Sequence, residues 1–277
     1  MLGIPAALSI LLVWVPAFMS AALSLTTWNG VGGFSAAEPV GAENYRQIAT
    51  NYPPFWPALQ HNLIWLGSFL FIATPIGLLL AVLLDKEIRG TRIYQTAIFL
   101  PVVLSLALIG FIWQLLYSPE QGLINNLFNA DVDWIGDSSI NLWSAMVAAS
   151  WRHVGYVMVI YLAGIKAVDP ALREAAAMDG ANELQVFRQV VFPSLRTTNV
   201  VVLVITIIES LRAFDLVYVL NHGRNGLELL SVLITENIIG EATRIGFGSA
   251  IAVILLMVSL GVIIPYLAQA LRKDPTS

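Results

Sequence analysis

Six polar residues lie inside stretches that are otherwise apolar, and their side chains could bind a polar solute. They fall into two groups, with Arg152, His153 and Tyr156 in one stretch and Glu209, Arg212 and Asp215 in another. Guanidinium, carboxylate, imidazole and phenol groups can all hydrogen-bond the hydroxyls of such a solute. An ionisable side chain at the centre of a bilayer costs about 2.5–3.5 kcal/mol on insertion scales, so each of these residues requires a function or a partner.

Two interpretations of these residues remain open. In the first, they line a pathway for the solute. In the second, Glu209, Arg212 and Asp215 neutralise one another, because successive members are three residues apart on one helix. We favour mutual pairing or a gate for these three residues. For Arg152, which lies at about the same depth as Glu209, we favour exposure to the pathway.

The sequence supports neither a catalytic centre nor a metal site. It contains no cysteine, its three histidines are scattered, and the H-E-x-x-H and G-x-S-x-G patterns are absent. These features are the usual signatures of metal sites and hydrolytic enzymes. We therefore expect no catalytic residue and no metal ligand in this chain.

The composition is that of an integral membrane protein. Of the 277 residues, 57% are hydrophobic and 12% are charged, and the mean hydropathy is +0.76. Soluble domains carry about 25% charged residues. The formal charge of −4 comes without any basic run, so nucleic acid is not an expected partner, whereas the lipid membrane is.

Six apolar stretches are long enough to cross a bilayer, since about 20 helical residues span its hydrocarbon core. They cover residues 4–25, 62–84, 97–117, 141–165, 198–220 and 247–271. The predicted fold is therefore an all-α integral membrane protein with six transmembrane helices, organised as a single transmembrane domain over residues 1–277.

The basic residues between these stretches indicate the orientation. Nine of the 14 fall on one side: Lys86, Arg89, Arg92, Lys166, Arg173, Arg188, Arg196, Arg272 and Lys273. The loops of the other side contain only Arg46, Arg224 and Arg244. Because cytoplasmic loops carry the excess of lysine and arginine, we expect the larger set and both termini to lie in the cytoplasm.

Two segments near the N-terminus admit a second interpretation. The first stretch could be a cleaved signal peptide, but no positive region precedes it and its apolar run exceeds the usual length. The long outside loop 26–60 is rich in tryptophan and tyrosine, which prefer the membrane interface. This loop is either an interfacial segment or a contact surface for an external partner.

A polar insert, residues 166–197, separates the fourth and fifth stretches. Asp169 can cap a helix, Gly180 permits the left-handed conformation that ends one, and a second amphipathic helix follows and closes at Pro193. The Glu174 carboxylate could accept a charge-assisted hydrogen bond, and the three alanines after it would let another surface approach closely. The insert is either a docking element or an ordinary amphipathic loop on the membrane.

This insert resembles the EAA loop, which marks the membrane subunits of binding-protein-dependent ATP-binding-cassette importers. The matching positions are Glu174, Ala175, Ala176, Gly180, Val190 and Pro193. Asp179 and Ala181 also match the form common in the carbohydrate-uptake branch, the maltose and glycerol-phosphate type. Weaker similarities at residues 122–125 and 214–220 extend the resemblance over almost the whole chain.

The resemblance implies that several proteins share the work. A cytoplasmic ATPase dimer would bind ATP and Mg²⁺ and would dock on the insert, which would act as a short coupling helix-turn-helix. The contact residues would be Glu174, Ala175, Ala176, Asp179, Gly180, Ala181 and Pro193. This chain has no G-x-x-x-x-G-K-[ST] phosphate loop, so we expect no cofactor in it.

The resemblance also implies partners for the solute. A second, related permease subunit, usually a different chain, would complete the pathway in a heterodimer. An extracytoplasmic solute-binding protein would deliver a sugar-like solute through a bacterial or archaeal cytoplasmic (inner) membrane. His222 and Arg224 depart from the glycine-rich turn usual in this branch, so the sequence does not identify the solute.

An ion-gradient-driven secondary transporter of a small polar solute is the main alternative. Such transporters are expected to show inverted repeats and broken half-helices around the site, and neither is evident in the sequence. An intramembrane enzyme is a third class, for which the sequence offers no clustered carboxylate pair. Dependence of uptake on ATP, as opposed to an ion gradient, separates the first two classes.

Overall fold

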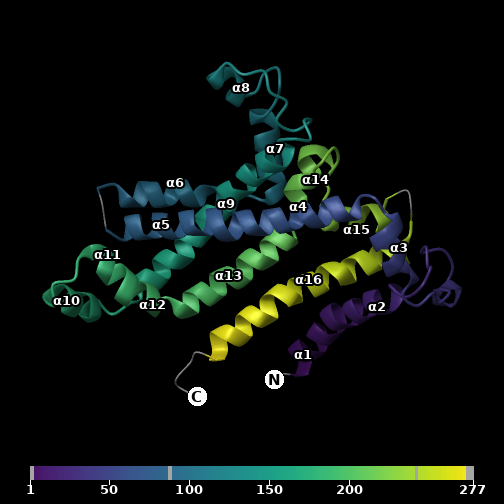
Figure 1. Cartoon of the computed structure of the whole chain (residues 1–277), viewed down its shortest axis with the longest axis horizontal. Coiled ribbons are helices and arrows are strands. Elements are labelled where there is room, and N and C mark those ends of the chain that lie inside the picture. Colours follow the sequence, from purple (N-terminus) through teal and green to yellow (C-terminus); the bar gives the residue numbers. More distant parts are fainter. Residues whose placement is uncertain (1–2, 87–88, 241–242, 273–277) are drawn as a thin grey trace.

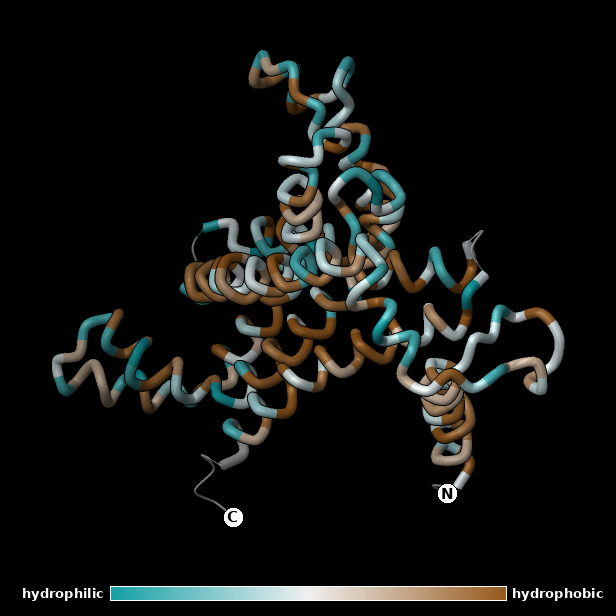
Figure 2. Tube along the Cα trace, turned by 45° about the vertical axis from the view of Figure 1, so that its right-hand side comes forward, coloured by the Kyte–Doolittle hydropathy of each residue, from teal (hydrophilic) through white to brown (hydrophobic). Residues whose placement is uncertain are grey.

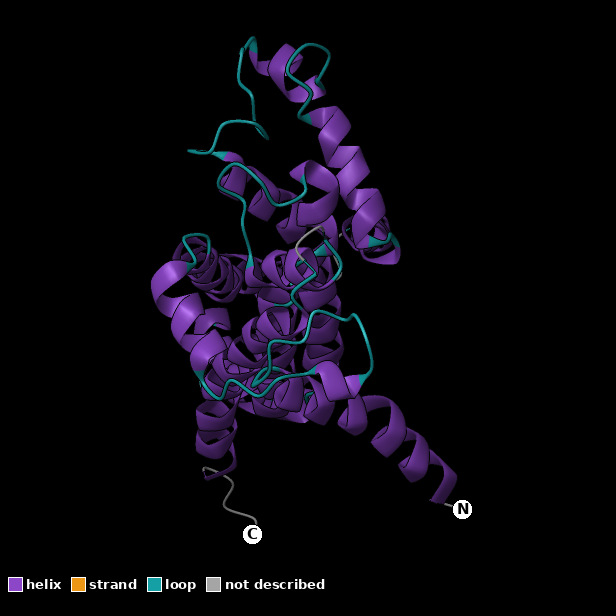
Figure 3. Ribbon diagram, turned by 90° about the vertical axis from the view of Figure 1, so that its right-hand side faces the viewer, coloured by secondary structure: helices purple, strands orange, loops and turns teal. Residues whose placement is uncertain are grey.

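The computed structural model describes residues 3–86, 89–240 and 243–272, and within these ranges the chain is folded almost entirely into helices (Figures 1 and 3). The described ranges contain one isolated bridge, between Thr26 and Pro39. The predicted all-α class is therefore confirmed for the described chain. Lys273, one of the residues used to predict the orientation, lies outside these ranges.

Four helices within the described ranges are long and apolar enough to cross a membrane. The first comprises α1 (Gly3–Ser9), a π-helical turn (Ile10–Trp14) and α2 (Val15–Leu23). The second comprises α4 (Phe55–Ser68), a π-helical turn (Phe69–Ala73) and α5 (Thr74–Asp85). The other two are α9 (Asn141–Lys166) and α16 (Ile245–Arg272).

These four helices lie where the apolar runs 4–25, 62–84, 141–165 and 247–271 predict them. The second helix differs most, because it already begins at Phe55. The predicted outside loop 26–60 therefore ends in helix, and it also contains α3 (Glu43–Asn51).

The predicted span 97–117 is wrong as a single helix. The structure has α6 (Thr91–Val103) and α7 (Leu106–Leu116), whose directions differ by 104°. Pro101 lacks the N–H group that would continue the helical bonding near the end of α6. Ser105 then caps α7, because its hydroxyl accepts a backbone N–H three residues later at 3.2 Å. Residues next to the break therefore determine where α6 ends and α7 begins.

The predicted span 198–220 is also interrupted. Helix α13 (Arg196–Leu211) has 16 residues, about 24 Å at 1.5 Å per residue, and α14 (Asp215–Asn221) follows after a three-residue break. Side chains of Asn62 and Ser231 donate hydrogen bonds to carbonyls at the end of α13 and within the break. Non-helical backbone at membrane depth is tolerated where it is buried in protein or lines a cavity.

Three π-helical turns in the described chain each precede a proline at the start of the next helical segment: Pro16, Pro75 and Pro193. In each turn the residue before the proline bonds a carbonyl five residues back, as the Thr74 N–H does with Phe69. Proline has no N–H and its ring clashes with the carbonyl four residues back. The wider turn accommodates that ring, so these helices continue, unlike α6 beyond Pro101.

Helix α9 is held against α5 and α6 by close approach at two glycines. A Cβ added to Gly77 of α5 would lie 2.7 Å from the Val157 side chain of α9. One added to Gly155 of α9 would lie 2.3 Å from the Ile98 carbonyl of α6. Small residues allow membrane helices to approach closely and gain packing contacts. This packing fixes the helix that carries Arg152.

Hydrophobic residues predominate along the long helices (Figure 2), and many of their large side chains are exposed. Phe71 and Ile93 are 80% and 74% exposed, and an extended apolar surface of this kind is covered by lipid in a membrane protein. The helix formed by α1 and α2 projects from the rest of the molecule, with Leu12 and Phe18 exposed (Figure 3). The C-terminal end of α2 lies close to Gly246, near the start of α16.

The remaining elements are short. They are a 3-10 turn (Phe34–Ala36), α8 (Leu123–Phe128) and α15 (Leu230–Ile238), and, in the insert, α10 (Pro170–Met178), α11 (Glu183–Val186), a π-helical turn (Phe187–Val191) and α12 (Phe192–Ser194). Figure 1 shows the insert at one end of the long helices and α3 with α15 at the other.

Candidate functional site

A cavity of about 260 Å³ lies where α4, α9 and the interrupted α13–α14 segment meet. Trp65 and Phe69 contribute aromatic surface, Arg152 and His153 come from α9, and much of the remaining lining comes from residues 208–216. The break between α13 and α14 therefore borders the cavity. Irregular backbone at such a place is the arrangement expected for a solute site in a membrane protein.

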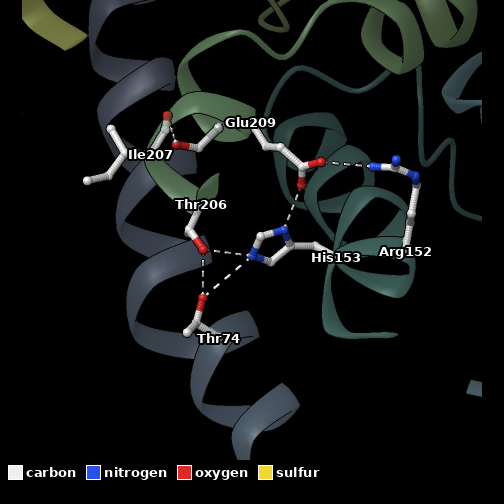
Figure 4. Close-up of polar contacts among 7 residues, drawn as sticks. Thr74, Arg152, His153, Thr206, Ile207 and Glu209 are labelled. Carbon is white, nitrogen blue, oxygen red and sulfur yellow. Dashed lines mark hydrogen bonds and ion pairs between the residues drawn. The ribbon is translucent and has the colours of Figure 1, made fainter. Parts of the chain in front are cut away.

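Glu209 joins Arg152 and His153 at the edge of this cavity (Figure 4). Its Oε1 accepts a hydrogen bond from Nη1 of Arg152 at 3.2 Å, and its Oε2 accepts one from Nδ1 of His153 at 2.9 Å. The side chains of Arg152 and Glu209 are 22% and 28% exposed. Each carboxylate oxygen therefore accepts a hydrogen bond, and Glu209 balances the charge of Arg152, which is largely shielded from water.

His153 is 1% exposed and connects three helices. Its Nε2 lies 3.2 Å from the Thr206 hydroxyl of α13 and 3.5 Å from the Thr74 hydroxyl of α5. Because the ionised Glu209 can only accept, we assign the imidazole proton to Nδ1, and Nε2 then accepts from Thr206. The imidazole also stacks on Phe69, with ring centroids 4.4 Å apart. This network fixes α5, α9 and α13 relative to one another.

The structure brings five of the six predicted pathway residues to the cavity: Arg152, His153, Glu209, Arg212 and Asp215. Tyr156, the sixth, is half-buried one turn further along α9 and is not part of this lining.

The predicted pairing of Glu209 with Arg212 is wrong. Glu209 instead binds Arg152 and His153 of α9. Arg212 follows the last residue of α13 and has φ −96° and ψ 10°, so a spacing of three no longer places it beside Glu209. Arg212 and Asp215 are both exposed, and within the described chain they form no ion pair with each other.

Sequence reasoning missed Trp65, Phe69, Thr74 and Thr206 as parts of the site. Aromatic residues are frequent in apolar helices, so the local pattern does not distinguish Trp65 or Phe69. Thr74 and Thr206 are polar residues within apolar stretches. That signal could have indicated hydrogen bonds between membrane helices.

The insert has the predicted helix, turn and second helix. Asp169 caps α10 by accepting a hydrogen bond from the Ala171 N–H at 2.9 Å. Gly180 has a φ of +83°, the left-handed conformation that glycine adopts without strain. Asn182 and Gln185 form a capping box at the start of α11.

Arg173 fastens α10 to the ends of α5 and α9. Its Nη1 lies 2.8 Å from the Asp85 carboxylate at the end of α5, and its Nη2 donates to the Ile165 carbonyl at 2.5 Å. Asp85 also pairs with Lys166 at 3.4 Å. In the sequence alone, Lys166 and Arg173 indicate only the orientation, because their partner is about 80 residues away along the chain.

A second ion pair fastens α11 to the residue after α5. Nζ of Lys86 lies 2.5 Å from the Glu183 carboxylate, and the two side chains are 51% and 84% exposed. The hydrogen bond from Lys86 holds the pKa of Glu183 below its ordinary value of 4.5.

The motif residues of the insert are open to contact. Those that are exposed are Glu174, Ala175, Asp179, Gly180 and Pro193, and Ala176 and Ala181 are half-buried. Met178 and Leu184, on either side of the turn, are 88% and 73% exposed. Apolar side chains this exposed beside a polar turn are suited to burial against a partner protein.

Comparison with known proteins identifies the family and the fold of this chain. Residues 73–275 match the family described as "Binding-protein-dependent transport system inner membrane component". The chain is 33% identical over 260 residues to a probable ABC transporter permease protein, PH1215, of Pyrococcus horikoshii, which covers 91% of this chain and 88% of that protein. It is 34% identical over 279 residues to the xylose/arabinose import permease protein XacH of Haloferax volcanii, which covers 96% and 85%.

A solved structure has the same fold. The chain matches, with a TM-score of 0.83 and 20% identity, a chain in the crystal structure of a bacterial ABC transporter involved in the import of the acidic polysaccharide alginate. The match covers 99% of this chain and 94% of that chain.

The resemblance carried by the insert is therefore confirmed by the rest of the sequence. The family match covers most of the chain, and two relatives share about a third of its residues over almost its whole length. Members of this family are transport components and not enzymes, and the ATPase is a separate subunit. This chain belongs to the family of binding-protein-dependent transport system inner membrane components, as a permease subunit of an ATP-binding-cassette importer.

Proposed function

We propose that this permease subunit carries an uncharged sugar, or a similar polyhydroxylated solute, into the cell. The cavity at the interruption of α13–α14 is the observation that supports this most directly. Its lining combines apolar side chains, among them Trp65, Phe69 and Phe214, with a small number of hydrogen-bonding groups. Ligand sites of this kind pair apolar walls with a few placed polar groups, and sugars present both types of surface.

The balance of charge supports an uncharged solute. Arg152 and Arg212 are matched in number by Glu209 and Asp215 among the cavity residues. A balanced wall gives an ion no net electrostatic advantage over an uncharged molecule. The Haloferax volcanii relative is named for xylose and arabinose, which are uncharged, whereas the structural match serves an acidic polysaccharide at only 20% identity.

The proposed arrangement is a single domain, residues 1–277, with six transmembrane segments. The four continuous helices, the bent pair α6–α7 and the interrupted α13–α14 would supply them. The excess of basic residues near the insert supports a cytoplasmic location for residues 166–197 and for both termini. The membrane would be a bacterial or archaeal cytoplasmic membrane.

The insert would couple transport to ATP hydrolysis in a partner. An ATPase dimer holding ATP and Mg²⁺ would dock on the motif residues: Glu174, Ala175, Ala176, Asp179, Gly180, Ala181 and Pro193. The ion pairs of Asp85 and Lys86 join the insert to α5, and α5 also carries Thr74 of the cavity network. Movement of the insert would therefore reach the cavity along one continuous helix.

Two further partners complete the proposal. A second, related permease subunit would form a heterodimer with this chain and close the pathway. An extracytoplasmic binding protein would deliver the solute, as the description of the family implies. The projecting helix α1–α2, with its exposed apolar side chains, supports contact with lipid or with the second subunit.

Broken helices do not distinguish this proposal from an ion-gradient-driven transporter. They are expected of secondary transporters, yet the structure interrupts two segments, α6–α7 and α13–α14, in a chain that belongs to an importer family. The family match therefore favours the ATP-driven function.

Transport by the complete complex in proteoliposomes tests the proposal. Uptake of radiolabelled pentoses, hexoses and disaccharides would be measured with the binding protein outside and ATP supplied at the ATPase side, without an ion gradient. We expect ATP-dependent uptake of at least one uncharged sugar. Uptake that requires a proton or sodium gradient, or ATP-dependent uptake confined to charged solutes, would contradict it.

The Glu174→Ala variant tests the coupling role of the insert. Loss of a charge-assisted hydrogen bond to the ATPase should lower ATP-dependent uptake about tenfold while the membrane subunits remain folded. Glu120→Ala, which removes an exposed carboxylate beyond α7, is the matched control and should behave as the wild type. Normal assembly with normal uptake for Glu174→Ala would refute the coupling role.

A further inference from the structure

A second cavity, of about 350 Å³, lies between α14 and α15. Its lining comes from α14 and the turn that follows, and from α15 and the residues just after it, among them Tyr218, His222, Arg224, Thr235, Glu236 and Ile239. We call this cavity the outer groove. Helix α15 lies at the end of the long helices opposite the insert (Figure 1), so the groove belongs to the side that the proposed orientation places outside the cell.

The outer groove and the cavity beside Glu209, the central cavity, share one face of α14. Phe214, directly before α14, lines the central cavity, whereas Tyr218 and His222 line the outer groove. The three residues are spaced by four, and residues at this spacing lie on the same face of a helix. The ring centroids of Phe214 and Tyr218 are 5.1 Å apart, and those of Tyr218 and His222 are 5.0 Å apart. A row of rings therefore joins one cavity to the other.

The rings of this row are accessible at the groove. Tyr218 is 39% exposed, His222 is exposed and Phe214 is half-buried. On the opposite side of α14, Val217 and Leu220 are buried against the other helices. Helix α14 thus packs through one side and presents its row of rings on the other.

Helix α15 leads from the central cavity into the outer groove. The hydroxyl of Ser231, near the start of α15, donates a hydrogen bond to the Ala213 carbonyl in the break that borders the central cavity. Thr235, one turn later, lines the outer groove, and its hydroxyl donates to the Ser231 carbonyl at 3.1 Å. Helices α14 and α15 therefore start beside the same break and form the groove one turn further along. This arrangement places the groove directly beyond the central cavity.

The polar side chains of the outer groove are free to bind a ligand. Those of His222, Arg224 and Glu236 are exposed, and within the described ranges none of them forms a hydrogen bond or an ion pair. Arg224 and Glu236 carry opposite charges, so the groove gives an ion no net electrostatic advantage. Aromatic rings can contact the apolar faces of a sugar while polar groups hydrogen-bond its hydroxyls. The chemistry of the groove therefore matches an uncharged sugar.

We infer that the outer groove is a second sugar-binding site, at which the solute lies against the ring of Tyr218 before it enters the central cavity. His222, Arg224 and Glu236 bind its hydroxyls there. The inference rests on the proposed function, because it takes the solute to be an uncharged sugar, and it adds a site that the solute reaches first. It also gives a role to His222 and Arg224, which depart from the turn usual in the carbohydrate-uptake branch.

Thiol labelling tests whether a sugar occupies the groove. The chain contains no cysteine, so a thiol introduced at one position is the only one in it. Thr235→Cys places a thiol in the groove lining, and Thr50→Cys is the matched control. Both threonines lie on helices at the outer end and donate to the carbonyl four residues back, but Thr50 lies on α3 and is not part of the groove lining.

The complete complex in proteoliposomes would be treated from outside with an uncharged methanethiosulfonate reagent, and the rate of labelling of this chain would be measured. The uncharged sugar that the wild type transports fastest, at saturation and without binding protein, should slow labelling of Thr235→Cys about threefold or more, because a bound ligand is largely enclosed. A sugar that the complex does not transport should leave that rate unchanged. Neither sugar should affect Thr50→Cys.

Three results would overturn the inference. The first is no slowing of Thr235→Cys by the transported sugar, and the second is equal slowing at Thr50→Cys or by the sugar that is not transported. The third is slowing by the binding protein alone, loaded or empty, which would make the groove a docking surface for that protein. If Thr235→Cys does not assemble, Ile239→Cys replaces it and the same results decide, because Ile239 also lines the groove and is 79% exposed.

Uptake tests the role of the Tyr218 ring. Tyr218→Phe keeps the ring, and Tyr218→Leu removes it but keeps an apolar side chain. Tyr218→Leu should lower the maximal rate of ATP-driven uptake about two- to tenfold, the effect of losing one aromatic contact, and Tyr218→Phe should stay close to the wild type. The concentration of binding protein that gives half-maximal uptake should not change. Equal maximal rates for the two variants would refute the role of the ring, and a higher half-maximal concentration would indicate docking of the binding protein instead.

Failure of the proposed function gives a different result. If the wild-type complex takes up no uncharged sugar with ATP, the solute class is wrong before any variant is compared. If the wild type takes up a sugar that does not slow labelling of Thr235→Cys, the proposed function stands and only the outer groove is refuted as a binding site.

Discussion

The cavity network and the anchors of the insert both use ion pairs to fasten helices together, but their surroundings differ. The side chains of Arg152 and Glu209 are 22% and 28% exposed, and Glu209 is bound a second time by the buried His153. Lys86 and Glu183 are 51% and 84% exposed and bind only each other at this contact. Removing one partner from a pair shielded from water leaves an uncompensated charge, whereas water and salt replace an exposed partner.

This difference teaches which contact the protein should depend on. The sequence places charged residues in both regions, and a count of charges alone would make the ion pairs of the insert the more important ones. Because the cavity pair is the less exposed, we expect the opposite order. The cavity network should control folding and transport together, while the insert should depend more on backbone geometry than on its exposed ion pair.

Glu209→Ala should have the largest effect. Arg152 would lose the carboxylate that balances it, and His153 would lose the acceptor for its Nδ1–H. Removing one partner of a buried ion pair costs about 3–5 kcal/mol of stability. Because this pair is partly exposed, we expect the free energy of unfolding to fall by about 3 kcal/mol. Thermal unfolding of the purified complex measures the loss of stability, and ATP-driven uptake should fall with it.

A double-mutant cycle with Arg152→Ala sharpens this prediction. If the pair acts as a unit, the double variant should be destabilised by at least about 1 kcal/mol less than the sum of the two single variants. Simple additivity would show that the contact contributes nothing of its own. Unchanged uptake affinity and rate for Arg152→Ala would remove Arg152 from the solute pathway.

The partner of Glu209 shows what the sequence could and could not predict. Arg212 is three residues away and was the natural choice, but the helix ends at Leu211, so the side chain leaves the expected face. The end of α13 is decided by tertiary contacts, since Asn62 donates to the Leu211 carbonyl from α4. Arg152 is the actual partner, and only the packing of α9 against α13 brings it within reach.

The break between α6 and α7 is easier to predict from the sequence than the partner of Glu209. Pro101 and Ser105 are local signals of a helix end and a helix start. The start of the first helix in the insert and the turn after it were predicted correctly for the same reason, because Asp169 and Gly180 act through neighbouring backbone. The predicted end of the second helix at Pro193 is wrong, because a π-helical turn carries the helix past that proline. Long apolar runs likewise predicted four helices to within a few residues at most ends. Contacts between distant residues, such as the ion pair of Arg152 with Glu209, have no local signal.

Gly180→Val should have an intermediate effect that is confined to coupling. A β-branched residue at φ +83° is strained by about 1–2 kcal/mol, and the turn between α10 and α11 would change direction to relieve that strain. Apart from the two neighbouring residues, no atom of the described ranges lies within 4 Å of an added Cβ, so the effect is one of backbone conformation and not of collision. Uptake per ATP hydrolysed should fall severalfold.

Gly41→Val is the matched control for this substitution. Gly41 has a φ of +57° and open space around an added Cβ, but it lies in the loop between α2 and α3, far from the insert in the sequence. It should show comparable backbone strain with normal coupling. If both variants lose coupling equally, general destabilisation is the cause and the turn at Gly180 has no special role.

Glu183→Gln should have the smallest effect, and the effect should depend on pH. Lys86 lowers the pKa of Glu183 in the folded protein, so the ionised form contributes to the docking of α11. That contribution is fully present above the ordinary value of 4.5 and is lost as the pH falls through the lowered value. Hydrogen–deuterium exchange of residues 183–194, corrected for the intrinsic effect of pH, should be slightly faster in the variant at pH 7.

The same measurement distinguishes this exposed pair from the cavity network. The difference between wild type and Glu183→Gln should shrink below pH 4.5 and also in high salt, because screening weakens exposed pairs. Lys86→Gln should reproduce the variant at pH 7, since either substitution removes the contact. A difference that persists in acid and in salt would mean that Glu183 acts through its shape. The contrast between the two regions would then rest on something other than exposure to water.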